Sequence, residues 1–265
     1  MKALIPVIGF SIFLLSCTEF EYSPHQVFDK DSPTNLNAKN LSRLLQTAND
    51  DTLRFVVSGD SQISQNAVVS LIRKINTLRG IDIVFLAGDI SEFGTLKEME
   101  WVVNESQKLK APYFGVIGNH DLIANGSTVF KRMFGELNYS FTYGGVKFIC
   151  HDTNGREYRF NGKVPDINWL ESELAGAEDS KAFVAISHVR PFTVDFDRKL
   201  DTAYSNLFNS KPDFLASFHA HDHSFGEYYP DHSRVPFIVT TSIGERGFLL
   251  VEIVNNQLKY ERVDF

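Results

Sequence analysis

The stretch YFGVIGNHD, residues 113–121, joins an apolar run to four residues that carry polar chemistry. Residues 113–117 combine aromatic and β-branched side chains, which predicts a buried β-strand. An amide, an imidazole and a carboxylate then follow as Asn119, His120 and Asp121. They stand where the strand ends, and open α/β sheets bind ligands at that edge. Taken alone, Gly118-Asn119-His120-Asp121 also fits an ordinary polar turn.

Two earlier strands are predicted to end in the same way. Residues 53–58 (LRFVVS) predict a strand that ends at Gly59-Asp60, and a helix follows over 66–79. Residues 81–87 (IDIVFLA) predict a second strand that ends at Gly88-Asp89, followed by a helix over 95–109. Neighbouring parallel strands in this β-α-β-α-β order would bring Asp60, Asp89 and Asn119 to one edge of the sheet.

The second half of the chain supplies more strand ends with polar tips. A hairpin is predicted from strands over 139–143 and 146–150 around Gly144-Gly145. After a helix over 166–175, a strand over 181–187 ends at His188, and a strand over 214–218 runs into the histidine-rich segment 219–223 (HAHDH). Residues 237–241, 248–253 and 258–263 predict three consecutive antiparallel strands.

Composition narrows the class of protein. The chain has 265 residues, 43% of them hydrophobic, and a formal net charge of −7, without a long run of Lys or Arg. This balance suits a globular domain and argues against non-specific nucleic-acid binding. The two cysteines, Cys17 and Cys150, do not form a CxxC motif, which argues against a thiolate zinc site or a disulfide framework.

The N-terminus indicates export. Lys2 precedes an uncharged run over residues 3–15, which is typical of a signal peptide and too short to span a bilayer comfortably. Residues 14–17 (LLSC) resemble the lipobox of bacterial lipoproteins, which implies a lipid anchor on Cys17; a plain signal peptide with a chance cysteine is the alternative. The acidic residues after Cys17 are similar to tethers of surface-exported lipoproteins of Gram-negative bacteria. We therefore expect a signal peptide at 1–16, a polar tether at 17–51 with at most a short helix at 38–47, and one domain at 52–265. The expected location is the cell envelope, at the outer membrane or cell surface.

The polar strand ends together suit a metal site. Carboxylates, amides and imidazoles mixed in this way are typical ligands of divalent first-row metals. The order D-x-Q (Asp60 and Gln62), G-D (Asp89), G-N-H-D (Asn119 and His120), H (His188) and H-x-H (His221 and His223) resembles the calcineurin-like metallophosphoesterase superfamily. The resemblance covers roughly residue 54 to the C-terminus.

The resemblance implies a single domain of α/β class, a four-layer α/β/β/α sandwich of two mixed β-sheets flanked by helices. It implies two divalent metal ions, Mn, Fe or Zn. One ion would be held by Asp60, Gln62, Asp89 and His223, and the other by Asp89, Asn119, His188 and His221. A hydroxide bridging the metals would attack phosphorus in line. His120 would stabilise developing charge or protonate the leaving oxygen, and Asp121 would orient its imidazole.

Two positions depart from the family pattern. Gln62 stands where the family usually has His, so it either ligates a metal or only forms a hydrogen bond, which would leave that metal weakly held. Ala220 stands where the family has Gly, and His219 precedes His221 by two residues. The H-x-H pair is therefore 221/223, which the H-A-H-D-H pattern favours, or 219/221.

The expected function is hydrolysis of a small-molecule phosphomonoester or phosphodiester. A nucleotide, nucleotide-sugar or lipid-head-group pyrophosphatase is the alternative enzyme, and a non-catalytic surface lipoprotein with a degenerate metal site is the alternative of another class. Arg156, Arg159 and Arg190 are candidates for gripping substrate phosphate. His151 and Asp152 follow a predicted strand and are candidates for lining the cleft, although each also fits an ordinary structural role.

Overall fold

The computed structural model describes residues 27–47, 52–62, 64–176 and 180–265. The signal peptide predicted at 1–16, the candidate lipidation site Cys17 and the beginning of the predicted tether lie outside these ranges. Within them, no helix combines the length and apolar character that crossing a bilayer requires.

The first of two sheets carries the strands that end in Asp60, Asp89 and Asn119. Its strand order is β11-β10-β1-β2-β3, with β1–β2 and β2–β3 parallel and the other pairs antiparallel. The strands are β1 (Thr52–Ser58), β2 (Ile83–Ala87), β3 (Tyr113–Val116), β10 (Gly247–Val254) and β11 (Gln257–Asp264). The parallel pairs align the three polar strand ends, as the β-α-β-α-β order predicts.

The second sheet has the strand order β4-β5-β6-β7-β9-β8. The strands are β4 (Tyr139–Tyr143), β5 (Val146–Cys150), β6 (Ala182–Ile186), β7 (Phe214–His219), β8 (Gly226–Tyr228) and β9 (Phe237–Val239). The prediction of three consecutive antiparallel strands is wrong for the first of them. β9 pairs parallel with β7 in this sheet, whereas β10 and β11 pair antiparallel in the other. An apolar run specifies a buried strand but not the sheet that it joins.

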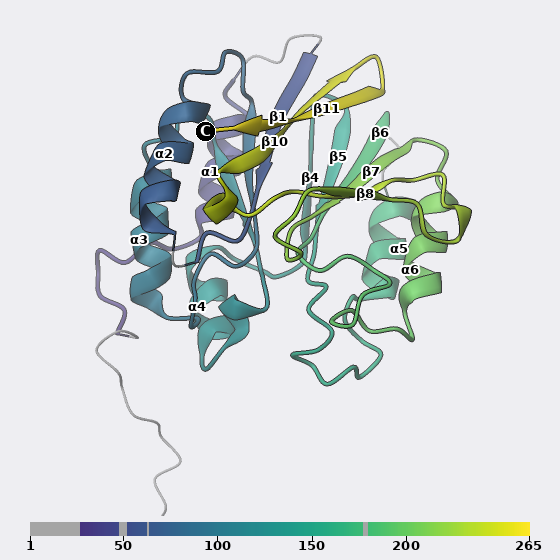
Figure 1. Cartoon of the computed structure of the whole chain (residues 1–265), viewed down its shortest axis with the longest axis horizontal. Helices are drawn as coiled ribbons and strands as arrows, with labels where there is room; N and C mark the ends of the chain where they lie inside the picture. Colours follow the sequence, from purple (N-terminus) through teal and green to yellow (C-terminus); the bar gives the residue numbers. More distant parts are fainter. Residues whose placement is uncertain (1–26, 48–51, 63, 177–179) are drawn as a thin grey trace, which may run out of the picture.

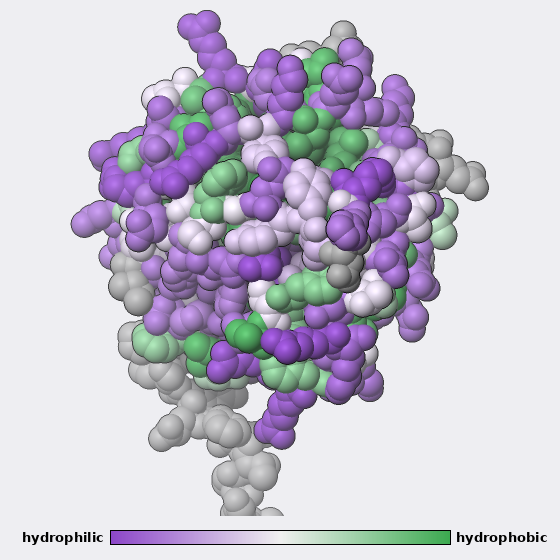
Figure 2. All heavy atoms as spheres, turned by 45° about the vertical axis from the view of Figure 1, so that its right-hand side comes forward, coloured by the Kyte–Doolittle hydropathy of each residue, from purple (hydrophilic) through white to green (hydrophobic). Residues whose placement is uncertain are grey.

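Helices cover the outer face of each sheet (Figure 1). The first sheet is covered by α2 (Gln65–Ile75), α3 (Leu96–Ser106) and α4 (Gly126–Met133), and the second by α5 (Ile167–Ala175) and α6 (Asp201–Asn209), while α1 (Leu36–Leu44) lies at the β3 edge of the first sheet. The chain is thus a four-layer α/β/β/α sandwich, which confirms the predicted fold. Figure 2 shows one face of this body, on which hydrophilic residues dominate and apolar ones form separate patches.

Phenylalanine fills the layer between the two sheets. The ring of Phe55 on β1 lies 5.3 Å from that of Phe148 on β5 and 5.7 Å from that of Phe218 on β7, in each case edge-on. Val56, the next residue along β1, faces the helices instead. Both faces of the strand are therefore buried, which explains its nearly continuous apolar sequence.

The short helix expected within the tether is α1, and it packs on the sheet. The Asn37 side chain accepts from the Gly115 backbone N–H at 2.9 Å and donates to the Gly115 carbonyl at 3.1 Å. Asn40 accepts from the Tyr113 N–H at 3.2 Å. These amides satisfy the open edge of β3. α1 therefore packs on the folded body although it lies upstream of the domain boundary expected at 52. The contact was not predictable from a hydrophobic pattern, because two asparagine side chains, and not an apolar strand, pair with the β3 backbone.

Candidate metal centre

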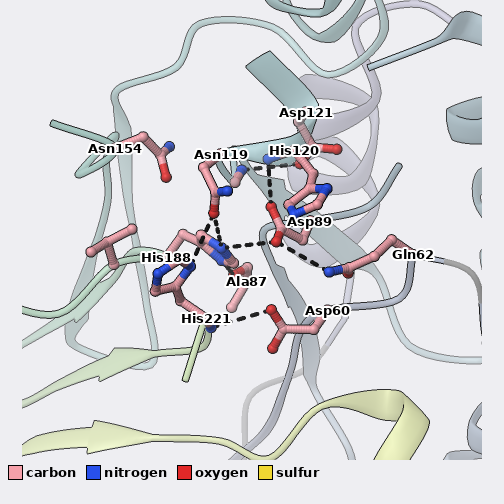
Figure 3. A network of polar contacts seen from close by, with 12 residues as sticks. Asp60, Gln62, Ala87, Asp89, Asn119, His120, Asp121, Asn154, His188 and His221 are labelled. Atoms are coloured by element: carbon pink, nitrogen blue, oxygen red, sulfur yellow. Dashed lines mark hydrogen bonds and ion pairs between the residues drawn. The ribbon is translucent and has the colours of Figure 1, made fainter. Parts of the chain in front are cut away.

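The polar strand ends of both sheets meet at one place. Asp60 follows β1, Asp89 follows β2 and Asn119 follows β3, while His188 follows β6 and His221 follows β7. Figure 3 shows these side chains pointing toward one another, with Gln62 approaching from the side of Asp60. We call Asp89, Asn119, His188 and His221 the inner set, and Asp60, Gln62 and His223 the outer set.

The glycines before Asp89 and Asn119 make the close approach possible. A Cβ on Gly88, whose φ is +92°, would lie 2.4 Å from His188 Nδ1. A Cβ on Gly118 would lie 2.1 Å from the Asp89 backbone nitrogen. No side chain fits at either position, so the G-D and G-N pairs are requirements of packing around the site.

Several site residues adopt a left-handed backbone without being glycine. Their φ values are 57° at Asp60, 53° at Asp89, 68° at His221 and 58° at His223. Such a conformation costs on the order of 1 kcal/mol or more per residue, and it persists where the surrounding fold imposes it. Backbone strain of this kind clusters at functional sites. Here it occurs where β1, β2 and β7 end, at residues whose side chains point into the site.

The inner set brings four potential ligand atoms together. Asn119 Oδ1 lies 3.1 Å from His188 Nε2 and 3.0 Å from His221 Nδ1. His188 Nε2 also lies 3.3 Å from Asp89 Oδ2. One ligand atom each of Asp89, His188 and His221 can be chosen so that all lie within 4.8 Å of one another, which is compatible with a single metal ion.

The far side of each imidazole fixes its tautomer. His188 Nδ1 lies 2.8 Å from the Ala87 carbonyl, and His221 Nε2 lies 3.0 Å from Asp195 Oδ2, so both of these nitrogens donate. In the neutral rings, the lone pairs of His188 Nε2 and His221 Nδ1 therefore face Asn119 Oδ1, which is itself an acceptor. Either a proton on the ring or a cation between these atoms removes the conflict.

Electrostatics inside the inner set point the same way. Burial lowers the pKa of His188, but the Asp89 and Asp60 carboxylates outweigh it and raise that pKa to about 10. Burial also opposes ionisation of Asp89, yet His188 holds the pKa of Asp89 below its usual value. The site thus stabilises positive charge at its centre, and a divalent ion supplies that charge more effectively than a proton does.

The outer set is more open. His223 Nε2 lies 3.5 Å from Asp60 Oδ1, and the His223 side chain is 55% exposed. Gln62 Nε2 donates to Asp89 Oδ2 at 3.3 Å. Within the described residues, the buried atoms Asp60 Oδ2 and Gln62 Oε1 have no hydrogen-bond partner. Buried acceptors left in this state fit a cation, because oxygen lone pairs are what a divalent ion would satisfy.

The structure distinguishes the two possible H-x-H pairs. His219 is buried in β7, where Ser187 Oγ lies 3.0 Å from its Nδ1 and Ser217 Oγ lies 2.9 Å from its Nε2. His219 therefore has both ring nitrogens occupied, and the pair that faces the site is His221 and His223. The methyl group of Ala220 packs over Gly59, where an added Cβ would lie 2.5 Å from it. Because Gly59 has no side chain, the methyl group of Ala220 has room at the position where the family has glycine.

His120 lies beside the inner set, but its imidazole is not oriented as predicted. Its backbone N–H donates to Asp89 Oδ1 at 2.9 Å, and its Nδ1 lies 3.0 Å from the Glu92 carbonyl and 3.6 Å from Glu92 Oε2. The expectation that Asp121 orients the ring is wrong. Asp121 is buried and accepts from the backbone N–H groups of Gly118, Ile90 and Ser91, so it ties the β2 and β3 ends together.

Asp195 is a site residue that sequence reasoning missed. It lies in the loop after β6, and its Oδ1 pairs with Arg156 Nη1 at 2.7 Å while its Oδ2 contacts His221. Arg190, another candidate phosphate ligand, is bound to Asp222 at 2.7 Å. Arg159 is exposed. Two of the three candidate arginines are therefore engaged by carboxylates rather than directed at the inner set.

His151 and Asp152 have structural roles. His151 Nε2 lies 2.8 Å from the Tyr204 hydroxyl, and burial lowers the pKa of His151 to about 4, so the ring is neutral at physiological pH. Asp152 accepts from the Asn154 N–H at 2.9 Å and from the Tyr158 hydroxyl at 2.9 Å. Both residues brace the loop after β5 instead of facing the metal centre.

Comparison with known proteins agrees with this geometry. Residues 53–225 match the family model of the calcineurin-like phosphoesterases, and this range includes all members of the inner and outer sets. A segment of 86 residues is 31% identical to a probable cyclic nucleotide phosphodiesterase of Xenorhabdus bovienii (strain SS-2004). The aligned segment is 32% of this chain and 34% of that relative, so the chain matches about a third of the relative's length.

Solved structures share the fold at low identity. A dimetal phosphatase from Danio rerio superimposes with a TM-score of 0.65 at 12% identity, covering 80% of this chain and 96% of that one. The purple acid phosphatase PPD1 from yellow lupin (Lupinus luteus) superimposes with a TM-score of 0.62 at 15% identity, covering 80% of this chain and 51% of that one. With the family model matching well over half of its length, the chain belongs to the calcineurin-like phosphoesterases.

Proposed function

We propose that the chain hydrolyses phosphomonoesters or phosphodiesters with two divalent metal ions, Mn, Fe or Zn. The observation that carries the proposal is the convergence of carboxylate, amide and imidazole ligand atoms from both sheets around Asn119 Oδ1. Asp89, Asn119, His188 and His221 would hold one ion. Asp60, Gln62 and His223 would hold the other together with Asp89. When bound, the ions would supply Lewis acidity toward the phosphoryl oxygens and activate a water as nucleophile.

The protein's own groups would position the substrate and move the proton. His120 would protonate the leaving oxygen through Nε2, because Nδ1 is directed at the Glu92 carbonyl. The Glu92 carboxylate, 3.6 Å from Nδ1, places a negative charge beside the protonated imidazole that would donate this proton. Asp121 supports the reaction indirectly, by holding the β2 and β3 ends at the spacing that the inner set needs.

Metal analysis together with an ester panel tests the proposal. The purified protein should contain two ions per chain after loading with manganese or zinc, and it should hydrolyse p-nitrophenyl phosphate or bis-p-nitrophenyl phosphate. Chelation should abolish turnover, and re-addition of metal should restore it. A loaded protein with at most one ion and no turnover of any ester would contradict the proposal.

We also propose that a lipid on Cys17 anchors the protein in the cell envelope. The support is sequence alone: Lys2, the uncharged run over residues 3–15 and the lipobox-like LLSC over residues 14–17. Cys17→Ala should move the protein from the membrane fraction to the soluble fraction of the cell envelope. Labelling with a radioactive fatty acid should mark the wild-type chain only. If the Cys17→Ala chain stayed in the membrane fraction without carrying the label, the proposal of a lipid anchor on Cys17 would be wrong.

A further inference from the structure

A groove of about 790 Å³ opens beside the outer set, between the start of α2, the β2–α3 loop and α3. Gln62 and Glu92 line its inner end, where it meets the metal centre. Phe93 and Trp101 supply aromatic surface further out, and Ile90 and Val102 add aliphatic surface. The groove is thus a largely apolar extension of the site that the metal ligands do not account for.

The groove begins on the side of His120. The Glu92 carbonyl, which holds His120 Nδ1, belongs to the same loop as Phe93. Since His120 is proposed to protonate the leaving oxygen, the group attached to that oxygen extends past Glu92 and into the groove. This step rests on the proposed function.

The aromatic surface is held in place. Phe93 is 58% exposed. Its backbone N–H donates to Glu98 Oε2 at 3.1 Å, which anchors the loop that carries it. Glu98 also accepts from the Thr95 hydroxyl at 2.8 Å in the capping box of α3. Trp101 is partly buried against the core under α3. Phe93 and Trp101 therefore offer a planar ring two aromatic surfaces along one groove.

Charge restricts what enters. Lys97 is the single cation among the described residues that line the groove, and its Nζ pairs with Glu100 Oε2 at 2.7 Å. Two carboxylates, Glu92 and Glu98, line the same surface. A leaving group that carried its own phosphate would meet these acids without a free cation to neutralise it. The lining thus disfavours the pyrophosphatase alternative and favours an uncharged leaving group.

We infer that the groove is the leaving-group subsite, and that it selects phosphoesters whose leaving group is uncharged and carries an aromatic ring system. A nucleoside is the test case, because it joins an alcohol to a planar base and has no charge of its own. Gln65 is a polar side chain in the groove that can bond the edge of such a ring.

Tryptophan fluorescence reads this subsite without metal or catalysis. The chain has two tryptophans, Trp101 and Trp169, so Trp169→Phe leaves Trp101 as the sole reporter. Adenosine should quench Trp101 saturably, whereas ribose at the same concentrations should not. Phe93→Ala in this background should weaken adenosine binding roughly tenfold, the scale of one base–aromatic stack. Leu45→Ala, which removes another exposed apolar side chain just after α1, should not change it.

Kinetics connect the subsite to the reaction. Adenosine should inhibit hydrolysis of bis-p-nitrophenyl phosphate competitively in the manganese-loaded enzyme, and Phe93→Ala should raise its inhibition constant by the same factor. Turnover of esters without adenosine binding, or binding that Phe93→Ala leaves unchanged, overturns the inference and leaves the proposed function intact. Adenosine binding in a protein that hydrolyses no ester overturns the proposed function and with it the leaving-group assignment.

Discussion

The inner and outer sets differ in how firmly the fold holds them. In the inner set, the far nitrogen of each histidine has a partner: His188 donates to the Ala87 carbonyl and His221 to Asp195. In the outer set, His223 is 55% exposed and contacts Asp60 at 3.5 Å, and Gln62 Oε1 has no partner within the described part of the chain. The inner set is therefore preorganised, whereas the outer set depends on the exposed His223 and on the neutral amide of Gln62.

The difference implies an order of metal binding. A ligand set that is already aligned loses little conformational freedom on binding, so the inner set should bind its ion more tightly. We expect the outer ion to be the one that exchanges more readily, and Gln62, which also lines the groove, would place it there. The following substitutions break or sharpen this contrast.

The largest effect is expected from Asp89→Asn, which removes the carboxylate that both sets share. Loss of this ligand should release both ions and lower activity on the order of 10³-fold or more, since the metals supply several kcal/mol of transition-state stabilisation. Metal analysis after desalting measures the first result and ester hydrolysis the second. Asp222→Asn, in the loop beside His221 but paired with Arg190, is the matched control and should retain both ions. An Asp89→Asn protein that kept two ions would show that the sets do not share this carboxylate.

His120→Ala comes next and separates chemistry from binding. Both ions should stay, because His120 contacts Asp89 through its backbone N–H, which alanine preserves. The kcat should fall by roughly 10² to 10⁴ for an alkyl phosphoester and by less for a p-nitrophenyl ester, whose leaving oxygen needs no proton. An equal loss on both esters would argue against a proton donor, and loss of metal would argue for a ligand.

The fold was largely predictable from sequence because its strands are apolar runs bounded by glycine. The β4–β5 hairpin has the predicted bounds, and α3 begins at Leu96 after the capping residue Thr95. α2 ends at Ile75 rather than at 79, since the Asn76 side chain turns to bond the Lys108 carbonyl and the Lys110 N–H. α6 was missed altogether, and no hydrophobic pattern assigns β9 to its sheet.

The site was predictable only where strands end. Asp60, Asp89, Asn119 and His188 follow apolar runs, so the topology alone brings them together. Asp195 contacts His221 from 26 residues away in a loop, and the Glu92 carbonyl reaches His120 from 28 residues away. Local patterns carry no signal for such contacts. An acidic residue near a histidine in space is visible only after folding.

A smaller effect is expected from Asp195→Ala, which tests why the inner set is firm. Without this acceptor, His221 can adopt the other tautomer or rotate, and the inner ion should bind 10 to 100 times more weakly. Competition with a fluorescent chelator measures the affinity. Arg156→Ala is the matched control: it removes the other partner of Asp195, but the pair is solvent-exposed, with Arg156 at 65%, so metal affinity should change little. Unchanged affinity in Asp195→Ala would show that the backbone alone fixes His221.

The smallest effect is expected from Gln62→His, which tests why the outer set is loose. Imidazole is a better ligand than a neutral amide for a borderline ion such as zinc, so the outer ion should bind about tenfold more tightly. The inner ion should be unaffected, because Gln62 reaches the inner set only through its 3.3 Å contact with Asp89. Stepwise chelator titration separates the two ions. Weaker outer binding in Gln62→His would mean that the pocket is shaped around the amide, and the contrast between the sets would then be one of geometry rather than ligand type.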